Sequence, residues 1–234
     1  MNANDVTKQF SMWASSHEKI MDETLRKTTV FNYSQFIEEI IGRTELSLKQ
    51  AAYILDAACG PGLISFALLD KHPNIHVEGI DLTEEMLIMA EKGKSEIERN
   101  ERINFQKASI EEIPFPGHTF DIVICSMVIH HTRVDKSLGE LLRVTKPGGK
   151  LIIADPGLAE HFRRFPGNII WRVFLFFFSI RKKWRAERDA TILSRSEWKN
   201  LLLQHGLTDI SIKDIGKKNP WLLRLFIISA RNIN

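Results

Sequence analysis

Segments with the pattern of buried strands alternate with segments with the pattern of amphipathic helices through the middle of the chain. The predicted strands are 51–58, 75–80, 102–106, 120–128 and 150–155. The predicted helices between them are 63–69, 83–98 and 134–145, and Thr83 is the expected N-cap of the second. Strands that alternate with helices over short connections are joined by right-handed crossovers. The pattern therefore predicts an α/β fold with a doubly wound, mostly parallel sheet and helices on both faces.

The two ends of the chain add further elements to this sheet. Helical residues before Ser47 precede the first strand and are expected to form a cover. Residues 147–149, Pro-Gly-Gly, are expected to turn the chain into the fifth strand. After that strand, a helix is predicted at 195–206 and strands at 208–215 and 221–231. Together these elements predict a Rossmann-like sheet of seven strands.

A length of 234 residues suffices for one well-filled α/β domain and is too short for two catalytic domains of ordinary size. We therefore expect a single domain that spans the chain. Its expected parts are an N-terminal helical cap (1–46), a cofactor-binding core (47–155), a lid insertion after the fifth strand (156–193), and a C-terminal helix with strands (194–234).

The composition is that of an ordinary globular protein. Hydrophobic residues make up 44% of the chain and charged residues 26%, which argues against a disordered or fibrous protein. The two cysteines, Cys59 and Cys125, do not make a disulfide framework, and no Cys/His cluster has zinc-ligand spacing, so no metal is expected. The start of the chain lacks the pattern of a secretory signal, and the longest apolar run, 169–180, is too short to cross a bilayer. We expect a cytoplasmic location.

Positive charge is concentrated in residues 161–188, which hold eight Arg or Lys, one acidic residue and eight aromatic residues. A nucleic-acid-binding protein more often spreads its basic residues over a whole face, so nucleic acid is not expected as a partner. A helix that is apolar all round must be covered by protein or lipid. This segment is therefore interpreted as a lid buried on its own domain, as a surface for a hydrophobic acceptor or a homodimer contact, or as a peripheral membrane contact.

The segment 56–62, DAACGPG, lies where the first strand gives way to a helix. Gly60 and Gly62 let the backbone approach a ligand closely, and Ala58 is small enough to do the same. Asp81 ends the second strand 21 residues after Gly60, where a carboxylate can accept both hydroxyls of a ribose. Together these residues predict a ligand that contains adenosine.

Asp56 bears on which nucleoside ligand this is. Gly60, Gly62 and Ser65 also imitate the glycine fingerprint of NAD-binding folds, so NAD stays an alternative. A carboxylate under the ligand loop is unfavourable near a pyrophosphate but favourable near an ammonium or a sulfonium. S-adenosylmethionine carries both of these cations, so the sequence favours it as the cofactor.

Four ordered motifs between residues 6 and 155 resemble those of a known family. They are ILDAACGPG, VEGIDLTEEML, ASIEEIPFPGHTFDIVICSMVIHH and LLRVTKPGGKLIIAD. The chain resembles the class I S-adenosylmethionine-dependent methyltransferases, particularly the small-molecule branch that includes quinone-biosynthesis C-methyltransferases. As a set, the motifs are specific for the fold and the cofactor, and weak on the substrate.

The resemblance implies a set of cofactor-binding residues. Asp56, Ala58 and Gly60 would hold the methionine part, and Asp81 with Leu82 would hold the ribose. The family usually has glycine where Ala58 stands, which would require only a slightly roomier backbone path. The remaining implied contacts are Met86 with the adenine, Ser109 and Ile110 on either side of the adenine, and the backbone carbonyl of Cys125 with the methionine ammonium. Many relatives have Asp at the position of Ser109, which weakens its implied bond to the adenine amine.

The segment VTKQFSMWASSHE at the N-terminus is similar to the part of these enzymes that closes over the cofactor. Phe10 and Trp13 are its candidate contacts, because an aromatic face near a sulfonium is attractive. The alternative is that these two residues, three apart, only form the apolar stripe of a helix.

His130 and His131 follow the fourth predicted strand, whose end lies beside the reacting methyl group in this fold. One of them could serve as a general base, since an unperturbed imidazole titrates near neutrality. Strand alternation would point the two rings in opposite directions, so at most one is expected to face the substrate. The alternative is that both only pack or form local hydrogen bonds, because methyl transfer needs little more than in-line placement and exclusion of water.

The sequence therefore predicts an enzyme that moves a methyl group from S-adenosylmethionine to a small hydrophobic acceptor by direct displacement. One alternative is an NAD-linked oxidoreductase, although neither Tyr33 nor Tyr53 has the lysine four residues on that reductases of the YxxxK type have. The other alternative is a binding module or a cyclase that keeps the cofactor but transfers no methyl group.

Overall fold

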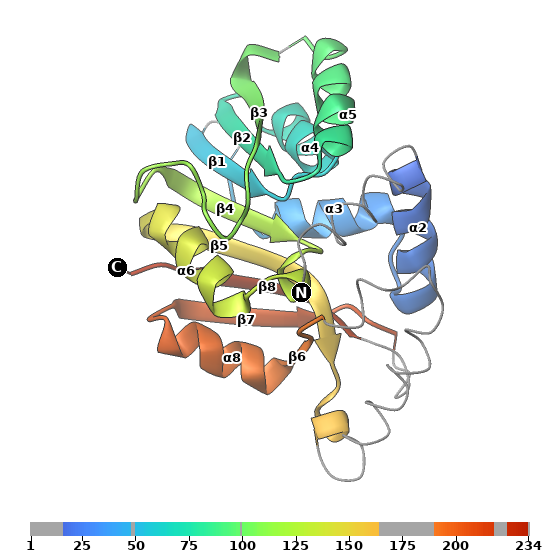
Figure 1. Cartoon of the computed structure of the whole chain (residues 1–234), viewed down its shortest axis with the longest axis vertical. Coiled ribbons are helices and arrows are strands. Elements are labelled where there is room, and N and C mark those ends of the chain that lie inside the picture. Colours follow the sequence, from blue (N-terminus) through green and yellow to red (C-terminus); the bar gives the residue numbers. More distant parts are fainter. Residues whose placement is uncertain (1–15, 48–49, 99, 164–189, 218–223, 234) are drawn as a thin grey trace.

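The computed structural model describes residues 16–47, 50–98, 100–163, 190–217 and 224–233 (Figure 1). Phe10, Trp13 and most of the basic and aromatic segment 161–188 lie outside the described residues. The interpretations of that segment as a lid, an acceptor or dimer surface, or a membrane contact therefore stay predictions.

One mixed sheet forms the centre of the molecule (Figure 1). Its strands follow the order β3-β2-β1-β4-β5-β8-β7, and the two-residue strand β6 pairs with β5 beside this path. The first five strands of the order are parallel to one another, whereas β8 runs antiparallel to both of its neighbours, β5 and β7. The bounds are β1 Ala52–Ala57, β2 Ile75–Asp81, β3 Ile103–Lys107, β4 Phe120–Ser126, β5 Thr145–Leu158, β6 Leu193–Ser194, β7 Thr208–Asp214 and β8 Arg224–Arg231.

Helices cover both faces of the sheet, so the predicted doubly wound α/β fold is confirmed. One hydrophobic core lies between the sheet and α2, α3 and α4, and the other lies between the sheet and α6 and α8. The helix α5 contacts α4, where Gly93 lies against Phe66. The helices are α2 His17–Thr28, α3 Tyr33–Gly42, α4 Leu63–Lys71, α5 Glu84–Ser95, α6 Val134–Val144 and α8 Arg195–Gln204, with 3-10 turns η2 Asn100–Arg102, η3 Ile129–His131 and η4 Glu160–Arg163.

Two local expectations differ from the structure. The strand β5 begins at Thr145, before the predicted Pro-Gly-Gly turn, and its pairing with β4 jumps from Phe120–Thr145 to Ile122–Lys150. Residues 146–149 therefore form an irregularity within the strand, which the positive φ of Gly148 (75°) permits. Thr83 occupies the N-cap position of α5, but its side chain makes no capping hydrogen bond.

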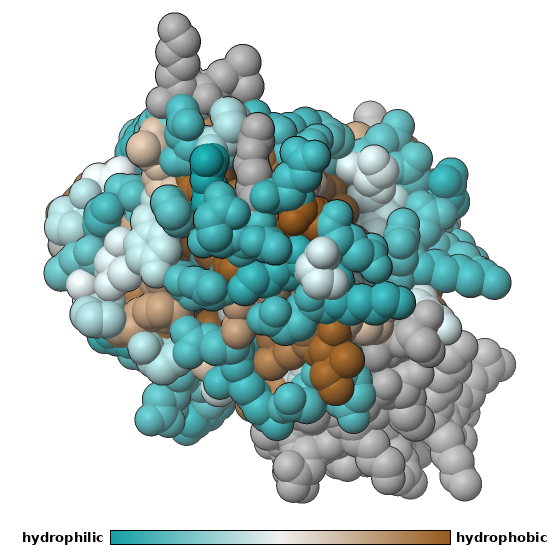
Figure 2. Space-filling view, turned by 90° about the horizontal axis from the view of Figure 1, so that it is seen from above, coloured by the Kyte–Doolittle hydropathy of each residue, from teal (hydrophilic) through white to brown (hydrophobic). Residues whose placement is uncertain are grey.

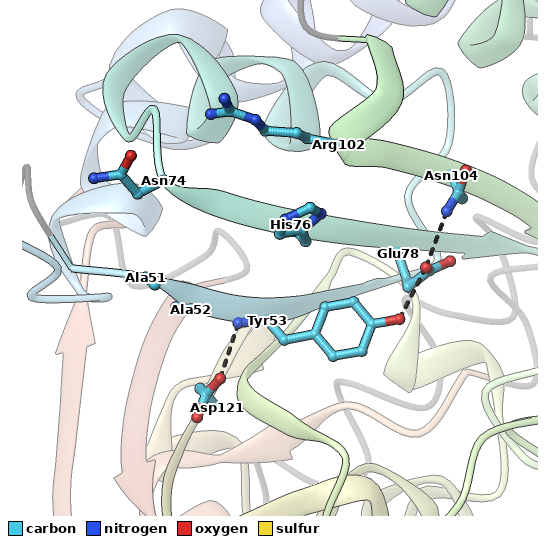
Figure 3. A pocket seen from close by; sticks show the side chains of 9 residues that line it. All are labelled: Ala51, Ala52, Tyr53, Asn74, His76, Glu78, Arg102, Asn104 and Asp121. Carbon is cyan, nitrogen blue, oxygen red and sulfur yellow. Dashed lines mark hydrogen bonds between the residues drawn. The ribbon is translucent and has the colours of Figure 1, made fainter.

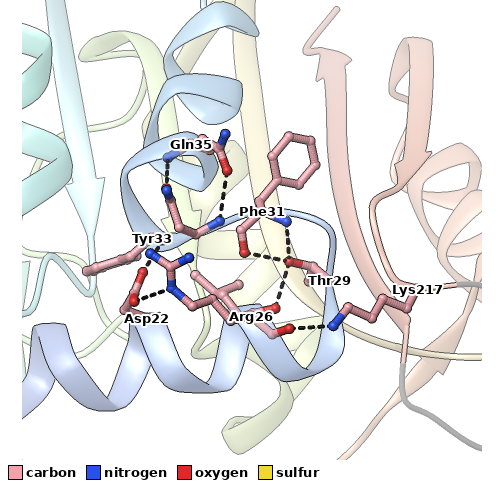
Figure 4. Close-up of polar contacts among 9 residues, drawn as sticks. Asp22, Arg26, Thr29, Phe31, Tyr33, Gln35 and Lys217 are labelled. Atoms are coloured by element: carbon pink, nitrogen blue, oxygen red, sulfur yellow. Dashed lines mark hydrogen bonds and ion pairs between the residues drawn. The ribbon is translucent and has the colours of Figure 1, made fainter.

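The N-terminal helices α2 and α3 are joined through Asp22 (Figure 4). One carboxylate oxygen of Asp22 accepts a hydrogen bond from the backbone N–H of Tyr33 at 3.0 Å, and the other accepts one from Arg26 at 2.6 Å. A reciprocal capping box between Asn32 and Gln35 begins α3. These bonds fix the angle between the two helices. Figure 1 shows α2 on the side of the sheet to which the parallel strands point.

The described surface is mixed. The face in Figure 2 is mostly hydrophilic, with smaller hydrophobic areas between the polar side chains. Large hydrophobic residues that are more than a third exposed are Val30, Leu82, Ile88, Leu203 and Ile233. Within the described ranges, none of the helices has both the length and the apolar character needed to cross a membrane.

Two glycines should respond to alanine in opposite directions. A Cβ on Gly79 in β2 would lie 2.6 Å from Cε1 of Phe105 and 3.0 Å from Sγ of Cys59, whereas a Cβ on Gly139 in α6 would meet nothing within 4 Å. Gly79→Ala should therefore lower the free energy of unfolding by about 1–3 kcal/mol through overpacking. Gly139→Ala should raise it by about 0.5–1 kcal/mol through helix propensity. Urea denaturation of both variants measures this difference, and equal effects would contradict the packing argument.

Candidate functional site

The glycine-rich turn between β1 and α4 has an unusual backbone. Ala58, Gly60 and Gly62 all have positive φ angles, of 63°, 54° and 83°. At Ala58 this conformation is strained for a residue with a Cβ, which explains why a glycine suits this position better. The sequence interpretation, that alanine at this position requires only more space for the backbone, is therefore incomplete. The free-energy cost of alanine comes from its positive φ angle.

The two glycines of the turn face different surroundings. The nearest side-chain atoms to a Cβ on Gly60 belong to His17, at 3.9 and 4.0 Å. A Cβ on Gly62 would lie 2.8 Å from Phe105 and 3.0 Å from Phe66. Gly62 therefore lets α4 and the sheet pack closely, a reason that the sequence interpretation did not include. Its predicted contact with a ligand stays a prediction.

Asp56 lies fully buried near the end of β1, with 0% of its surface exposed. Its Oδ2 atom accepts a hydrogen bond from Oγ of Ser65 at 2.6 Å, and its Oδ1 atom has no partner among the described residues. Burial raises the pKa of this carboxyl to about 6, the Ser65 hydroxyl opposes the rise, and the charge of Asp81 adds to it. A buried carboxylate with an unused oxygen is suited to a cationic ligand group.

Asp81 ends β2 and holds the turn together. Its Oδ2 atom accepts the N–H of Gly60 at 2.9 Å, and its Oδ1 atom accepts the N–H of Thr83 at 2.8 Å. Burial raises the pKa of Asp81, and these backbone hydrogen bonds oppose the rise. A carboxylate has about four lone-pair sites, so both oxygens keep capacity for a ribose. The predicted ribose contact is therefore compatible with a second task, which is to fix Gly60.

The predicted adenine and ribose contacts at Leu82, Met86, Ser109 and Ile110 lie in the connections that follow β2 and β3. Leu82 follows β2 and is 38% exposed, whereas Met86 in α5 is only 2% exposed. Ser109 and Ile110 lie in the connection after β3, where Oγ of Ser109 accepts the N–H of Glu111 at 3.1 Å and Ile110 is buried. Their roles as cofactor contacts stay predictions. Because Met86 is buried, its side chain packs inside the protein and offers little surface to a ligand.

Cys125 lies in β4, between β1 and β5. It is paired with Ala57 on one side and Ile153 on the other. Burial raises the pKa of its thiol well above the usual value, and the carboxylates of Asp155 and Asp56 add to the effect. A thiol in this state is a small apolar group. The implied contact of its backbone carbonyl with an ammonium stays a prediction.

His130 and His131 lie in the 3-10 turn η3, and not on a continued strand. Met127, directly after β4, has a φ of 57° and ends the extended chain. Both rings are buried and lie against each other, with centroids 4.0 Å apart. The prediction that strand alternation points them in opposite directions is therefore wrong, because a positive φ followed by a 3-10 turn replaces the strand.

Asp155 is a site residue that the sequence interpretation missed. It follows Ala154, the last residue of β5 that pairs with β4. Its Oδ1 atom lies 2.8 Å from Nδ1 of His130, and the side chains of both residues are at least 96% buried. Burial raises the pKa of Asp155, and His130 opposes the rise. The signal in the sequence was an acidic residue that follows four apolar or small residues (LIIA) at the end of a predicted strand.

A separate polar groove of about 420 Å³ lies at the opposite ends of the strands (Figure 3). Here the hydroxyl of Tyr53 donates to Glu78 at 2.9 Å, Asn104 donates to the same oxygen at 3.2 Å, and Asp121 accepts the N–H of Tyr53. Burial and then Glu78 raise the pKa of Tyr53 to about 12. Parallel α/β sheets bind ligands at the carboxyl ends of their strands, so this groove is not the expected site.

The residues at the carboxyl ends fit S-adenosylmethionine. The unpartnered oxygen of Asp56 suits an ammonium, and Asp81 has lone pairs for ribose hydroxyls. Among the described residues, the nearest atom to a Cβ on Gly60 is Nε2 of His17, at 3.9 Å. A pyrophosphate, in contrast, would meet the buried carboxyl group of Asp56 and the half-buried one of Asp81 next to the turn.

Comparison with known proteins agrees with this geometry. Residues 55–153 match the model of the methyltransferase domain family. A demethylmenaquinone methyltransferase of Symbiobacterium thermophilum is 30% identical over 173 residues, which are 70% of this chain and 67% of the relative. The ubiquinone/menaquinone biosynthesis C-methyltransferase UbiE of Dinoroseobacter shibae is 31% identical over 132 residues, and the match covers 53% of each chain. The chain thus spans about half the length of some curated relatives it matches.

A solved structure shows the same fold at low sequence identity. The geranyl diphosphate C-methyltransferase of Streptomyces coelicolor A3(2) superimposes with a TM-score of 0.68 and 13% identity, over 85% of this chain and 78% of that one. The class that the fold and the turn define is the Rossmann-like methyltransferases. The chain belongs to the class I S-adenosylmethionine-dependent methyltransferases. This membership confirms the predicted family and cofactor, and these matches give no support to the NAD-linked alternative.

Proposed function

We propose that this protein transfers a methyl group from S-adenosylmethionine to a small hydrophobic acceptor by direct displacement. The observation that carries the proposal is Asp56, a fully buried carboxylate with one oxygen that has no hydrogen-bond partner in the described part of the chain, next to the turn that contains Gly60. When bound, S-adenosylmethionine supplies an activated methyl group on a sulfonium. The protein supplies binding and orientation, which account for most of the rate in such a reaction.

Each part of the site has a proposed task. Asp56 holds the ammonium, and Ala58 and Gly60 form the floor under the methionine part. Asp81 and Leu82 hold the ribose, Met86, Ser109 and Ile110 line the adenine, and the carbonyl of Cys125 faces the ammonium. Phe10 is a proposed contact from outside the described residues. The division of the single domain into cap, core, insertion and C-terminal part at residues 46, 155 and 193 is likewise a proposal.

His130 is the proposed general base for an acceptor that loses a proton. Its Nδ1 atom lies 2.8 Å from Oδ1 of Asp155, and in the tautomer that donates from Nδ1 to this carboxylate the lone pair is on Nε2. Asp155 acts on the reaction through His130 and is therefore a positioning residue. His131 stacks on the same ring at 4.0 Å and is the second candidate. Relatives named as quinone-biosynthesis methyltransferases support a quinol-like acceptor as the first one to test.

Titration calorimetry with S-adenosylmethionine and with NAD tests the cofactor, and we expect binding of the first and none of the second. Formation of S-adenosylhomocysteine with a series of hydroquinones of increasing alkyl length tests the acceptor, and we expect turnover to increase with chain length. Binding of NAD alone would refute the cofactor proposal. Cofactor binding without S-adenosylhomocysteine formation on hydroquinones, phenols or amines would favour a binding module or a cyclase.

A further inference from the structure

His17, the first residue of α2, lies over the glycine turn. Its Nε2 and Cε1 atoms are 3.9 and 4.0 Å from the Cβ position of Gly60, the residue proposed to support the methionine part of the cofactor. Its ring meets the ring of Tyr33 edge-on, at a centroid distance of 6.1 Å and an angle of 63°. The sequence interpretation did not assign a role to this histidine.

The position of the His17 ring is fixed by buried structure. Tyr33 begins α3 and is 8% exposed, and Asp22 of α2 accepts its backbone N–H at 3.0 Å (Figure 4). Helix α3 is in turn packed into the hydrophobic core through Phe36, Ile37 and Ile40. The ring is therefore held by two connected helices over the turn and does not depend on a surface loop.

The His17 imidazole has an unused polar atom. Its Nδ1 atom is buried and has no hydrogen-bond partner in the part of the chain that the structure describes. Burial lowers the pKa of His17 to about 4, so the ring is neutral at pH 7. An unsatisfied buried nitrogen costs free energy, which a ligand that bonds to it would recover.

Among the described residues, acidic groups lie next to the turn and the Tyr33 ring. Asp56 and Glu18 act electrostatically on Tyr33, whose ring contacts His17, and Asp81 accepts the N–H of Gly60. The methionine part of S-adenosylmethionine carries a carboxylate on the same carbon as the ammonium. If Asp56 binds the ammonium, the carboxylate lies close to these acidic groups and needs a positive partner.

We propose that His17 binds the carboxylate of S-adenosylmethionine and takes up part of a proton, on average, from the solvent as it does so. The inference rests on the proposed cofactor role of Asp56 and adds a residue and a linked proton to it. A carboxylate beside the imidazole favours its protonated form, so the pKa of His17 rises on binding. Affinity for the cofactor therefore decreases as the pH rises through the pKa of His17 in the complex.

The test combines a variant with a modified ligand. Calorimetry at pH 6.5 in phosphate and in bis-Tris gives the number of protons taken up, since the two buffers differ in ionisation enthalpy. Wild-type protein should take up several tenths of a proton more than His17→Gln when S-adenosylmethionine binds, and should bind it about tenfold more tightly. Decarboxylated S-adenosylmethionine, which lacks the carboxylate, should bind both proteins equally and with equal proton uptake.

Two further variants separate the inference from loss of folding. His17→Phe keeps the aromatic contact with Tyr33 and should reproduce the loss of proton uptake, with an unchanged melting temperature. His76→Gln removes an exposed histidine from the groove at the other end of the strands and should behave as wild type. Asp56 is present in all of these proteins, so its own titration cancels in the differences.

The outcomes are distinct. Equal affinity and equal proton uptake in wild type and His17→Gln would overturn the role of His17 and leave the cofactor proposal intact. Failure of wild type to bind S-adenosylmethionine at all would refute the cofactor proposal itself. A loss of affinity in His17→Gln that is the same for the decarboxylated ligand would show that His17 only shapes the turn, and would also overturn the inference.

Discussion

Replacing Asp56 with Asn should reduce the affinity for S-adenosylmethionine by about 30-fold or more. The carboxylate is fully buried, so its attraction for an ammonium is screened little by solvent. Removing one partner of a buried charge pair costs about 2–5 kcal/mol of binding free energy, and each 1.4 kcal/mol is a factor of ten. Asn keeps the size of the side chain and can still accept the hydrogen bond from Ser65 at its remaining oxygen.

The same variant should not lose stability. Burial raises the pKa of Asp56 from 3.8 to about 6, so the folded state holds its proton more tightly than the unfolded chain. The stability that this proton provides is fully present below pH 4 and is lost as the pH rises through about 6, by roughly 1.4 kcal/mol per unit of pKa shift. Asn stays neutral throughout. Asp56→Asn should therefore melt at the same or a higher temperature at pH 7, with a weaker pH dependence between 4 and 7.

Asp121→Asn is the matched control for this experiment. Asp121 lies at the other end of the strands, about 40% exposed, and pairs with Lys146 and the backbone of Tyr53. Its replacement should leave the cofactor affinity unchanged. Calorimetry measures the affinities and differential scanning fluorimetry at several pH values measures the melting temperatures. A cofactor affinity within threefold of wild type in Asp56→Asn would refute the role assigned to Asp56.

The features that local sequence patterns determine were predicted correctly. Alternation of apolar strands with amphipathic helices set the parallel part of the sheet, because each crossover depends on neighbouring segments only. Asp56 and Asp81 were placed at strand ends for the same reason. The parallel order then brings both to one edge of the sheet, on either side of Gly60.

The features that were missed depend on backbone angles or on contacts between distant segments. The φ of 57° at Met127 turns the chain after β4, and no strand pattern indicates such an angle in a residue other than glycine. The contact of Asp155 with His130 joins residues 25 apart, and His17 reaches Gly60 over 43 residues. Only the packed fold brings these residues together, so their contacts could not be predicted from the sequence.

The second large effect is expected at the pair of His130 and Asp155. His130→Ala should lower kcat with a quinol-like acceptor by about 100-fold or more, the usual contribution of a general base. Asp155→Asn should lower it by a similar factor, because a neutral amide no longer stabilises the imidazolium that forms on His130 and can hold the ring in the wrong tautomer. Neither variant should change the affinity for S-adenosylmethionine by more than about twofold, since neither residue is assigned to the cofactor.

A double variant distinguishes a catalytic pair from two structural residues. If Asp155 acts only through His130, the variant with both His130→Ala and Asp155→Asn should be no slower than His130→Ala alone. The free energy of unfolding should also be non-additive. His130→Ala leaves a buried carboxyl without its partner and should lower the free energy of unfolding by about 1–3 kcal/mol. Adding Asp155→Asn should recover part of this loss. His131→Gln is the control, with a smaller expected loss of kcat. Additive losses of kcat, or a normal kcat in Asp155→Asn, would show that the buried pair serves the fold and not the reaction.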